Sequence, residues 1–395
     1  MIKIVSFFFV IGKNKDMAKR KILIVADVFG KTNNGTSMTT KRLIDGLKQR
    51  DYQVLVVSPI NQKEQGYYQL KKRRFFGFDK YVEKNGVMLA KPDKKLLREL
   101  IGQVDIVHII LPFKTGKMAV KICKQLGKPF TVGFHCPAEA FTAHIGLKNN
   151  RFVNNLIYKR YYNQFYKHAN LVHCPTKHLA QDLKNKGYRN KFKVVSNGVS
   201  EDFVCNKQDK PDEFKDKFCI LYVGRLSVEK RHDVLLKAVI LSKHNQKIQL
   251  IFAGDGPRKS KILKLSKKLK NLLVCKFLNT QELVKTMNFC DLYVHCSDVE
   301  TEGISCIEAI SCNMVPLISD SPRSATKDFA LTQDNLFEHG NAYSLMQKID
   351  FFIENPTRLA QLKNMYKSYG KQFEIKNCIE KMCEMFEQAI EQNNT

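Results

Sequence analysis

Two glutamates, Glu300 and Glu308, stand on either side of a turn of mostly small residues in the second half of the sequence. The apolar spacing after this turn predicts a helix that begins near residue 304, so Glu300 precedes the helix and Glu308 lies in its first turns. Carboxylates in these positions can accept hydrogen bonds from the hydroxyl groups of a sugar and of a ribose. The pair alone fits equally well a capping carboxylate followed by a solvated helix glutamate.

The turn between the glutamates is suited to binding an anion. Backbone N–H groups at Gly303, Ile304 and Ser305 would point out of the predicted helix N-terminus, where the helix dipole favours negative charge. A diphosphate is the kind of group that such a terminus binds. The sequence therefore places a candidate anion site between the two carboxylates.

Two cations, Arg225 and Lys230, follow a predicted strand over residues 218–223. Gly224 lets the chain leave this strand in a tight turn, and the next predicted strand ends at a similar turn with Gly254. A guanidinium and an ammonium on one loop could hold a diphosphate between them without a metal ion. One strand that ends at a glycine turn is a weak signal of a binding site. Two such turns followed by the glutamate loop, in this order along the chain, are a stronger signal.

This ordered set resembles the motifs of the group 1 glycosyltransferases, retaining enzymes of the GT-B fold, over nearly the whole chain. The resemblance implies that Arg225 and Lys230 hold the donor diphosphate, Glu300 the sugar and Glu308 the ribose. The chain departs from the family pattern at three positions where Gly, Phe and Pro are common. By the resemblance, such polar replacements occur in members that act on diacylglycerol and related lipids. These replacements are Thr301, Glu302 and Ser305. The donor-binding residues that the resemblance implies are Gly35, Gly254, Gly303, Ile304, Ser305 and Glu308.

The first half of the sequence supplies one further candidate catalytic residue. His135 ends a predicted strand, and Pro137 prevents its regular continuation. A histidine after a strand is more often structural, but the resemblance implies that His135 faces the donor sugar and orients its hydroxyls. Glu139 is a weaker candidate for acceptor contact, or a carboxylate at a helix entry.

The alternation of strands and helices predicts an α/β protein with two Rossmann-like domains whose parallel sheets face a cleft. A chain of 395 residues suits two such domains. The resemblance adds a last helix that crosses back to the first domain. Met17, directly before the first strand, is slightly favoured as the true start. The predicted parts are an N-terminal extension 1–20, an acceptor- and membrane-facing domain 21–205, a nucleotide-sugar-binding domain 206–374 and the crossing helix 375–395.

Charge divides the chain unequally. Residues 1–200 hold 38 Lys and Arg against 12 Asp and Glu, a net charge of +26, whereas residues 201–395 hold 28 against 26, a net charge of +2. The first half should therefore be attracted to an anionic surface, either lipid headgroups or nucleic acid. The near-neutral second half suits a small donor molecule.

Aromatic residues beside the cations suit a bilayer interface. The segment 67–78 mixes four consecutive cations with aromatic rings, and the segment 158–167 repeats the mixture. The same composition would serve single-stranded nucleic acid, and in a helix the rings could simply be core residues. The residues predicted to face the membrane and the acceptor are Lys71, Lys72, Arg73, Arg74, Phe75 and Phe76.

The twelve cysteines show no C-x-x-C spacing and are expected to be free thiols in a reducing compartment. No stretch reaches the roughly 20 apolar residues that cross a bilayer, so membrane contact should be peripheral. We expect a cytoplasmic protein bound to the inner face of the cell membrane. We expect neither a metal site nor a cofactor, with a UDP-sugar as co-substrate.

Together these features predict a retaining hexosyltransferase that moves a hexose, most readily glucose, from a UDP-sugar to a lipid such as diacylglycerol or glycosyl-diacylglycerol. Its partners would be a nucleotide sugar, an anionic membrane surface and the lipid acceptor, without nucleic acid. A glycosyltransferase of capsule or envelope polysaccharide synthesis is the alternative enzyme. A basic nucleic-acid-binding module is a further alternative, which explains the charge but not the loop between Glu300 and Glu308.

Overall fold

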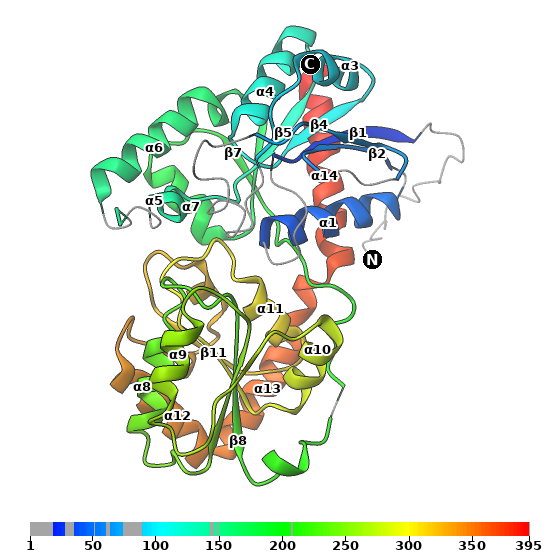
Figure 1. The fold of residues 1–395 in the computed structure, drawn as a ribbon. Helices are drawn as coiled ribbons and strands as arrows, with labels where there is room; N and C mark the ends of the chain where they lie inside the picture. The colour runs from blue at the N-terminus through cyan, green and yellow to red at the C-terminus, as the bar shows by residue number, and fades with distance from the viewer. Residues whose placement is uncertain are drawn as a thin grey trace, which may run out of the picture.

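The protein consists of two α/β domains, which lie one above the other in Figure 1. Each domain is built on one sheet in which all strand pairs are parallel, with helices around it. This architecture confirms the predicted pair of Rossmann-like domains. The computed structural model describes residues 19–27, 35–50, 52–60, 64–73, 89–142, 146–147, 150–206 and 208–394.

The first domain contains a seven-stranded sheet in the order β3-β2-β1-β4-β5-β6-β7. Its central strands are continuous apolar runs because helices cover both faces of the sheet, and residues 22–25 of β1 are fully buried. The strands are β1 (Arg20–Val25), β2 (Tyr52–Ser58), β3 (Tyr67–Gln69), β4 (Ile106–Ile109), β5 (Phe130–Gly133), β6 (Leu171–Cys174) and β7 (Lys191–Val194). The helices are α1 (Gly35–Lys48), α3 (Lys94–Gly102), α4 (Lys114–Leu126), α5 (Ala138–Thr142), α6 (Arg151–Gln164) and α7 (Lys177–Asn185).

The second domain contains a six-stranded sheet in the order β10-β9-β8-β11-β12-β13. The structure gives β8, β9 and α11 the bounds that the apolar runs and the glycine turns predict. The strands are β8 (Phe218–Val223), β9 (Ile248–Ala253), β10 (Val274–Lys276), β11 (Leu292–His295), β12 (Pro316–Ser319) and β13 (Leu336–Phe337). The helices are α8 (His232–Leu241), α9 (Lys259–Ser266), α10 (Thr280–Phe289), α11 (Ile304–Ser311), α12 (Ala342–Glu354) and α13 (Pro356–Gly370).

The last helix, α14 (Ile375–Asn394), leaves the second domain and packs on the first, beside α1 (Figure 1). Its apolar side chains recur at helical spacing and join the core cluster that contains β1 and β2. Gly46 of α1 allows this approach, because a Cβ at that position would lie 2.5 Å from Cγ1 of Ile379. The crossing helix is thereby confirmed. The buried residues of α14 in this cluster are Cys378, Ile379, Met382, Met385, Phe386, Ala389 and Ile390.

The twelve cysteines are all free thiols, as expected. In the described part of the chain, no helix combines the length and the apolar character that a membrane crossing needs.

The aromatic rings of segment 158–167 do not face a membrane. Tyr158, Tyr161, Phe165 and Tyr166 are buried in the core of the first domain. The core interpretation of these rings is therefore the correct one, because the helix turns Tyr158 and Tyr161 toward the core and its cations toward water.

Candidate active site

The candidate site lies where the strand order of the second sheet reverses, between β8 and β11. β8 runs into Gly224, and β11 is followed by the loop that carries Glu300 and by the N-terminus of α11. Ligands of open parallel sheets bind in this crevice, at the C-terminal ends of the strands. The first domain contacts the same loop, since the Thr176 hydroxyl donates to the carbonyl oxygen of Thr301 at 3.2 Å.

The glycine turns after β8 and β9 pack directly on each other. Gly224 has a φ of 153°, which favours glycine. A Cβ on Gly254 would lie 2.0 Å from the carbonyl oxygen of Gly224. Backbone hydrogen bonds fix this arrangement, from Gly224 N to Ala253 O at 3.1 Å and from Leu226 N to Asp255 O at 3.0 Å. The two turns thus form one rigid floor on which a ligand can approach the backbone closely.

Lys230 and Glu300 meet at this floor. Lys230 Nζ donates to Oε1 of Glu300, and Nε2 of His295 lies 3.3 Å from the same oxygen. Burial raises the pKa of Glu300, but the Lys230 charge and His295 outweigh it and hold that pKa well below the usual range. Glu300 is therefore a permanent anion that can accept hydroxyl hydrogens, and the ammonium of Lys230 has further hydrogens for a second anion.

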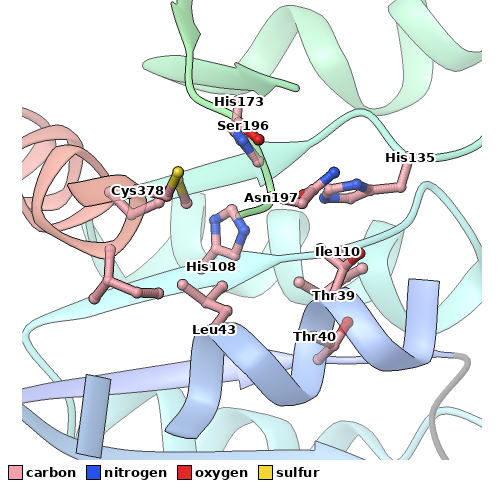
Figure 2. A pocket seen from close by; sticks show the side chains of 12 residues that line it. Thr39, Thr40, Leu43, His108, Ile110, His135, His173, Ser196, Asn197 and Cys378 are labelled. Atoms are coloured by element: carbon pink, nitrogen blue, oxygen red, sulfur yellow. The ribbon is translucent and has the colours of Figure 1, made fainter. Parts of the chain in front are cut away.

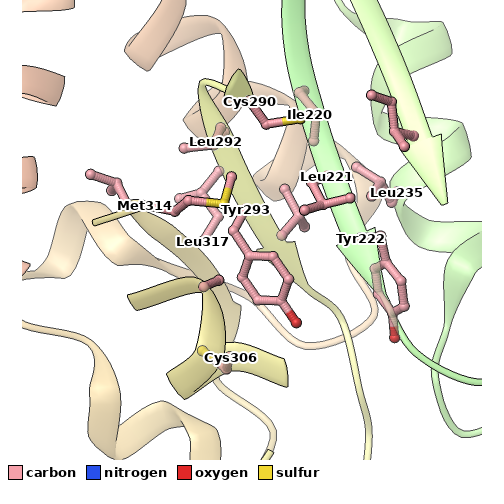
Figure 3. Packing of buried hydrophobic residues seen from close by; sticks show 14 of the residues in the cluster. Ile220, Leu221, Tyr222, Leu235, Cys290, Leu292, Tyr293, Cys306, Met314 and Leu317 are labelled. Carbon is pink, nitrogen blue, oxygen red and sulfur yellow. The ribbon is translucent and has the colours of Figure 1, made fainter. Parts of the chain in front are cut away.

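Two tyrosines connect the apolar core of the second domain to these residues (Figure 3). The Tyr222 hydroxyl donates to the carbonyl oxygen of Lys230 at 2.9 Å. The Tyr293 hydroxyl lies 3.0 Å from Nδ1 of His295 and 3.0 Å from Oγ of Ser305. Both rings are fully buried, so the core fixes the positions of the site residues.

The N-terminus of α11 borders the site at Gly303. This residue has a φ of 82°, and a Cβ there would lie 2.2 Å from Cγ2 of Thr326. Only glycine fits, and the first N–H groups of the helix, at Ile304 and Ser305, follow directly. The structure thus brings the predicted anion site close to His295, whose Nε2 would lie 3.5 Å from the same Cβ.

Arg225 lies on the floor, one residue beyond Gly224, with a partly buried side chain. Its role in holding a diphosphate stays a prediction. The same is true of Gly35, the first residue of α1. A Cβ at Gly35 would meet no described atom within 4 Å, so packing by the described residues does not require a glycine there.

Glu308 is buried in α11 and forms an ion pair across the two domains. Nη2 of Arg42, on α1, lies 2.6 Å from Oε1 of Glu308. Burial raises the pKa of Glu308, and the charge of Arg42 opposes that rise. Arg42 also donates through Nη1 to the carbonyl oxygen of Gly198, in the segment that leaves the first domain, at 2.9 Å.

Glu302 makes a further contact between the domains. Its carboxylate accepts hydrogen bonds from the Ser196 hydroxyl and from the backbone and side-chain nitrogens of Asn197. Burial raises the pKa of Glu302 to about 7, against these hydrogen bonds and the charge of Arg42. The glutamate that departs from the family pattern therefore serves to join the domains.

His135 lines a pocket of the first domain with His108 and His173 (Figure 2). The His135 and His173 ring centroids are 5.4 Å apart. Burial lowers the pKa of His135 to about 3 and that of His173 to about 4, and it places the pKa of His108 well below its usual value. These rings are neutral at physiological pH and can donate or accept hydrogen bonds with hydroxyl groups.

The structure says less about the role of the remaining predicted residues. Lys71 and Lys72 follow β3 and are exposed, and Arg73 is partly buried. Arg74, Phe75 and Phe76 lie outside the described residues, as do residues 1–18. Glu139 accepts a hydrogen bond from the Tyr158 hydroxyl at 2.7 Å, which gives it a local structural role.

Sequence reasoning missed Arg42, His295 and the hinge residues Ser196 and Asn197. His295 ends the strand before Glu300, so its position after an apolar run was a usable signal. Arg42 carried no such signal, because the exposed face of an amphipathic helix normally holds arginines.

Comparison with known proteins supports an enzyme with this fold. Residues 33–203 match the model of Glycosyltransferase Family 4, and residues 205–373 match that of Glycosyl transferases group 1. The alpha-monoglucosyldiacylglycerol synthase of Acholeplasma laidlawii is 23% identical over 390 residues, which cover 91% of this chain and 95% of that protein.

Two solved structures are also similar. The Anabaena protein Alr3699/HepE, in complex with UDP and glucose, has a TM-score of 0.72 at 16% identity and covers 93% of this chain and 100% of its own. The catalytic domain of cholesterol-alpha-glucosyltransferase from Helicobacter pylori is 44% identical, covers 40% of this chain and 98% of its own, and has a TM-score of 0.39. The two family models together match both domains, and the chain belongs to the group 1 glycosyl transferases, with the GT-B fold.

Proposed function

We propose that the protein transfers a hexose, most readily glucose, from a UDP-sugar to a hydroxyl group of a membrane lipid, with retention of the anomeric configuration. The observation that carries this proposal is the cluster of Lys230, Glu300 and the N-terminus of α11 at the reversal point of the second sheet. A cation and a helix N-terminus suit a diphosphate, and an ionised carboxylate beside them suits sugar hydroxyls.

In this proposal the two phosphates bind between Lys230, Arg225 and the first N–H groups of α11, without a metal ion. Glu300 accepts hydrogen bonds from the sugar, and His135 contacts it from the first domain. As the bond to the anomeric carbon breaks, negative charge develops on the leaving diphosphate, and the two cations stabilise it. The leaving phosphate oxygen takes the proton of the acceptor hydroxyl, which attacks from the same face.

A lipid acceptor is supported by the relative from Acholeplasma laidlawii, which is named as a glucosyldiacylglycerol synthase, and by the surface of α6. Phe152 and Leu156 are 79% and 59% exposed, one turn apart on this helix. Arg151, Lys159 and Arg160 are exposed on the same helix. Apolar side chains flanked by cations on a projecting helix suit an anionic bilayer (Figure 1).

The function is tested by incubating the protein with UDP-glucose and vesicles that contain diacylglycerol, glucosyl-diacylglycerol, a sterol or no added acceptor. We expect UDP release that depends on an acceptor lipid, and an α-linked glucoside identified by NMR. A β-linked product would contradict retention. Turnover with a lipid-linked glycan but with none of these lipids would support the alternative of envelope polysaccharide synthesis. No turnover with any nucleotide sugar would contradict the whole assignment.

The membrane surface makes a separate prediction. Replacing both Phe152 and Leu156 by serine should weaken binding to vesicles rich in anionic lipid by at least 10-fold, because each side chain loses apolar burial of about 1.5–3 kcal/mol when fully inserted. Vesicle co-sedimentation measures the change. Folding and UDP affinity should stay unchanged, because both side chains are exposed.

Leu272→Ser is the matched control, since Leu272 is 92% exposed but belongs to the second domain. It should bind vesicles as the wild type does. Equal vesicle binding by the wild type and the Phe152/Leu156 double variant would exclude α6 as the membrane contact.

A further inference from the structure

Arg42 connects three parts of the molecule that the donor site needs in one arrangement. It extends from α1 of the first domain, its Nη1 donates to the carbonyl of Gly198 in the connecting segment, and its Nη2 binds Glu308 of α11 in the second domain. The Arg42 and Glu308 side chains are each 10% exposed. The contact is therefore a buried ion pair and differs from a mobile surface pair.

The pair stabilises the ionised form of Glu308. A buried carboxylate without a partner favours its protonated form, and burial does raise the pKa of Glu308. The Arg42 charge opposes this effect and so favours the ionised carboxylate. An ionised carboxylate accepts hydrogen bonds at both oxygens, whereas a protonated one has lost part of that capacity.

A ribose cannot simply replace Arg42 on Glu308. Ribose hydroxyls are neutral, and a hydrogen bond between a neutral and a charged group is weaker than a buried ion pair with a short charge-assisted hydrogen bond. Displacement would also leave the guanidinium buried without its carboxylate. Because Arg42 engages Oε1, the ribose can share the carboxylate by binding at Oε2.

We propose that Arg42 is a positioning residue for the nucleotide donor, which orients Glu308 toward the ribose hydroxyls and makes donor affinity depend on the closed arrangement of the two domains. The proposal rests on the function proposed above, and specifically on the ribose-binding role of Glu308. In this proposal Arg42 of the acceptor domain contributes to recognition of the nucleotide although it does not contact the nucleotide.

The contact made by Glu302 allows loss of the closed domain arrangement to be separated from loss of the orientation of Glu308. Glu302 holds Ser196 and Asn197 through its own hydrogen bonds, on the same connecting segment that Arg42 contacts at Gly198. Loss of Arg42 therefore leaves the Glu302 hydrogen bonds and the hydrogen bond from Thr176 to Thr301 in place. Variants at Arg42 should remain folded while the carboxylate of Glu308 loses its orientation.

The test compares UDP with uridine diphosphates that lack the 2′- or 3′-hydroxyl, by calorimetric titration of the full-length protein. The wild type should bind UDP at least 10-fold more tightly than the deoxy analogue whose missing hydroxyl meets Glu308. In Arg42→Ala, UDP affinity should fall by about 10-fold and this preference should largely disappear. Arg42→Lys, which keeps the charge but loses the planar fork, should lie between the two.

Arg50→Lys is the matched control, because Arg50 also lies in the first domain and donates to a backbone carbonyl, that of Lys376, away from α11. It should keep the wild-type preference. An Arg42→Ala protein that weakens UDP and both deoxy analogues equally, or that retains the full preference, overturns the proposal. Absence of binding of any nucleoside diphosphate to the wild type would instead overturn the donor assignment itself.

Discussion

Lys230→Ala should lower kcat/KM for the nucleotide sugar by about 10² or more, because the ammonium would no longer stabilise the charge that develops on the leaving diphosphate. The change is measured as acceptor-dependent release of UDP under steady-state conditions. Lys237→Ala is the matched control, since Lys237 is exposed on α8, seven residues along the chain. The control should have wild-type activity.

The variant must be distinguished from an unfolded protein, because Lys230 is also the ion-pair partner of Glu300. Loss of one partner of a buried pair costs about 3–5 kcal/mol of stability, and somewhat less for a pair that is partly exposed, as this one is. The double variant Lys230→Ala/Glu300→Gln removes the unpaired charge and should recover most of the melting temperature lost in the single variant. It should remain inactive. A double variant that recovers both stability and turnover would show that Lys230 acts only as a structural partner.

Gly254→Ala should destabilise the protein more than the addition of a methyl group at any other glycine of the second domain. The added Cβ would lie 2.0 Å from the carbonyl oxygen of Gly224, a backbone atom that no rotamer change can move away. Overpacking commonly costs about 1–3 kcal/mol, and here relief requires the two turns to separate. We expect a lower melting temperature and at least 10-fold weaker UDP binding.

Gly102→Ala provides the comparison for that experiment. Gly102 is the last residue of α3, and a Cβ there would meet no described atom within 4 Å. This variant should melt and bind UDP as the wild type does, or be slightly more stable, since alanine favours helix. If Gly254→Ala behaved in the same way, the two turns would not form a rigid floor.

The elements of the second domain could be predicted closely because their signals are local. β8 and β9 are apolar runs that end at glycines, and α11 begins after a glycine and continues with helical spacing, so each boundary depends on a few neighbouring residues. The sequence placed Lys230 and Glu300 in one candidate site but did not predict their ion pair, which forms because β8 and β11 are adjacent strands.

The contacts between the domains could not be predicted in this way. Arg42 and Glu308 are separated by 266 positions, and no local pattern marks either residue as a partner of the other. Glu302 was visible only as an unusual polar residue, and its meaning depends on how Ser196 and Asn197 approach it. Such pairs arise from the relative placement of two domains, which periodicity and turn chemistry do not encode.

The direction of a helix face is also set by its tertiary neighbours. On α6 the buried tyrosines and the exposed Phe152 are all aromatic, and the sequence left open whether the rings of segment 158–167 face a membrane or the core. The low amphipathic contrast of this helix, with aromatic residues on several sides, explains why the sequence could not decide between the two.

The crossing of α14 has a consequence for how the protein is made on the ribosome. Strand β7 completes the first sheet at Val194, yet the helix that covers one of its faces starts at Ile375, after another 180 residues have been translated. At roughly 5–20 residues per second this delay lasts roughly 10–40 s. During that interval the apolar side chains that later meet Met382, Phe386 and Ile390 have no helix over them. The nascent first domain therefore exposes an apolar surface to which chaperones can bind until the whole second domain has been synthesised.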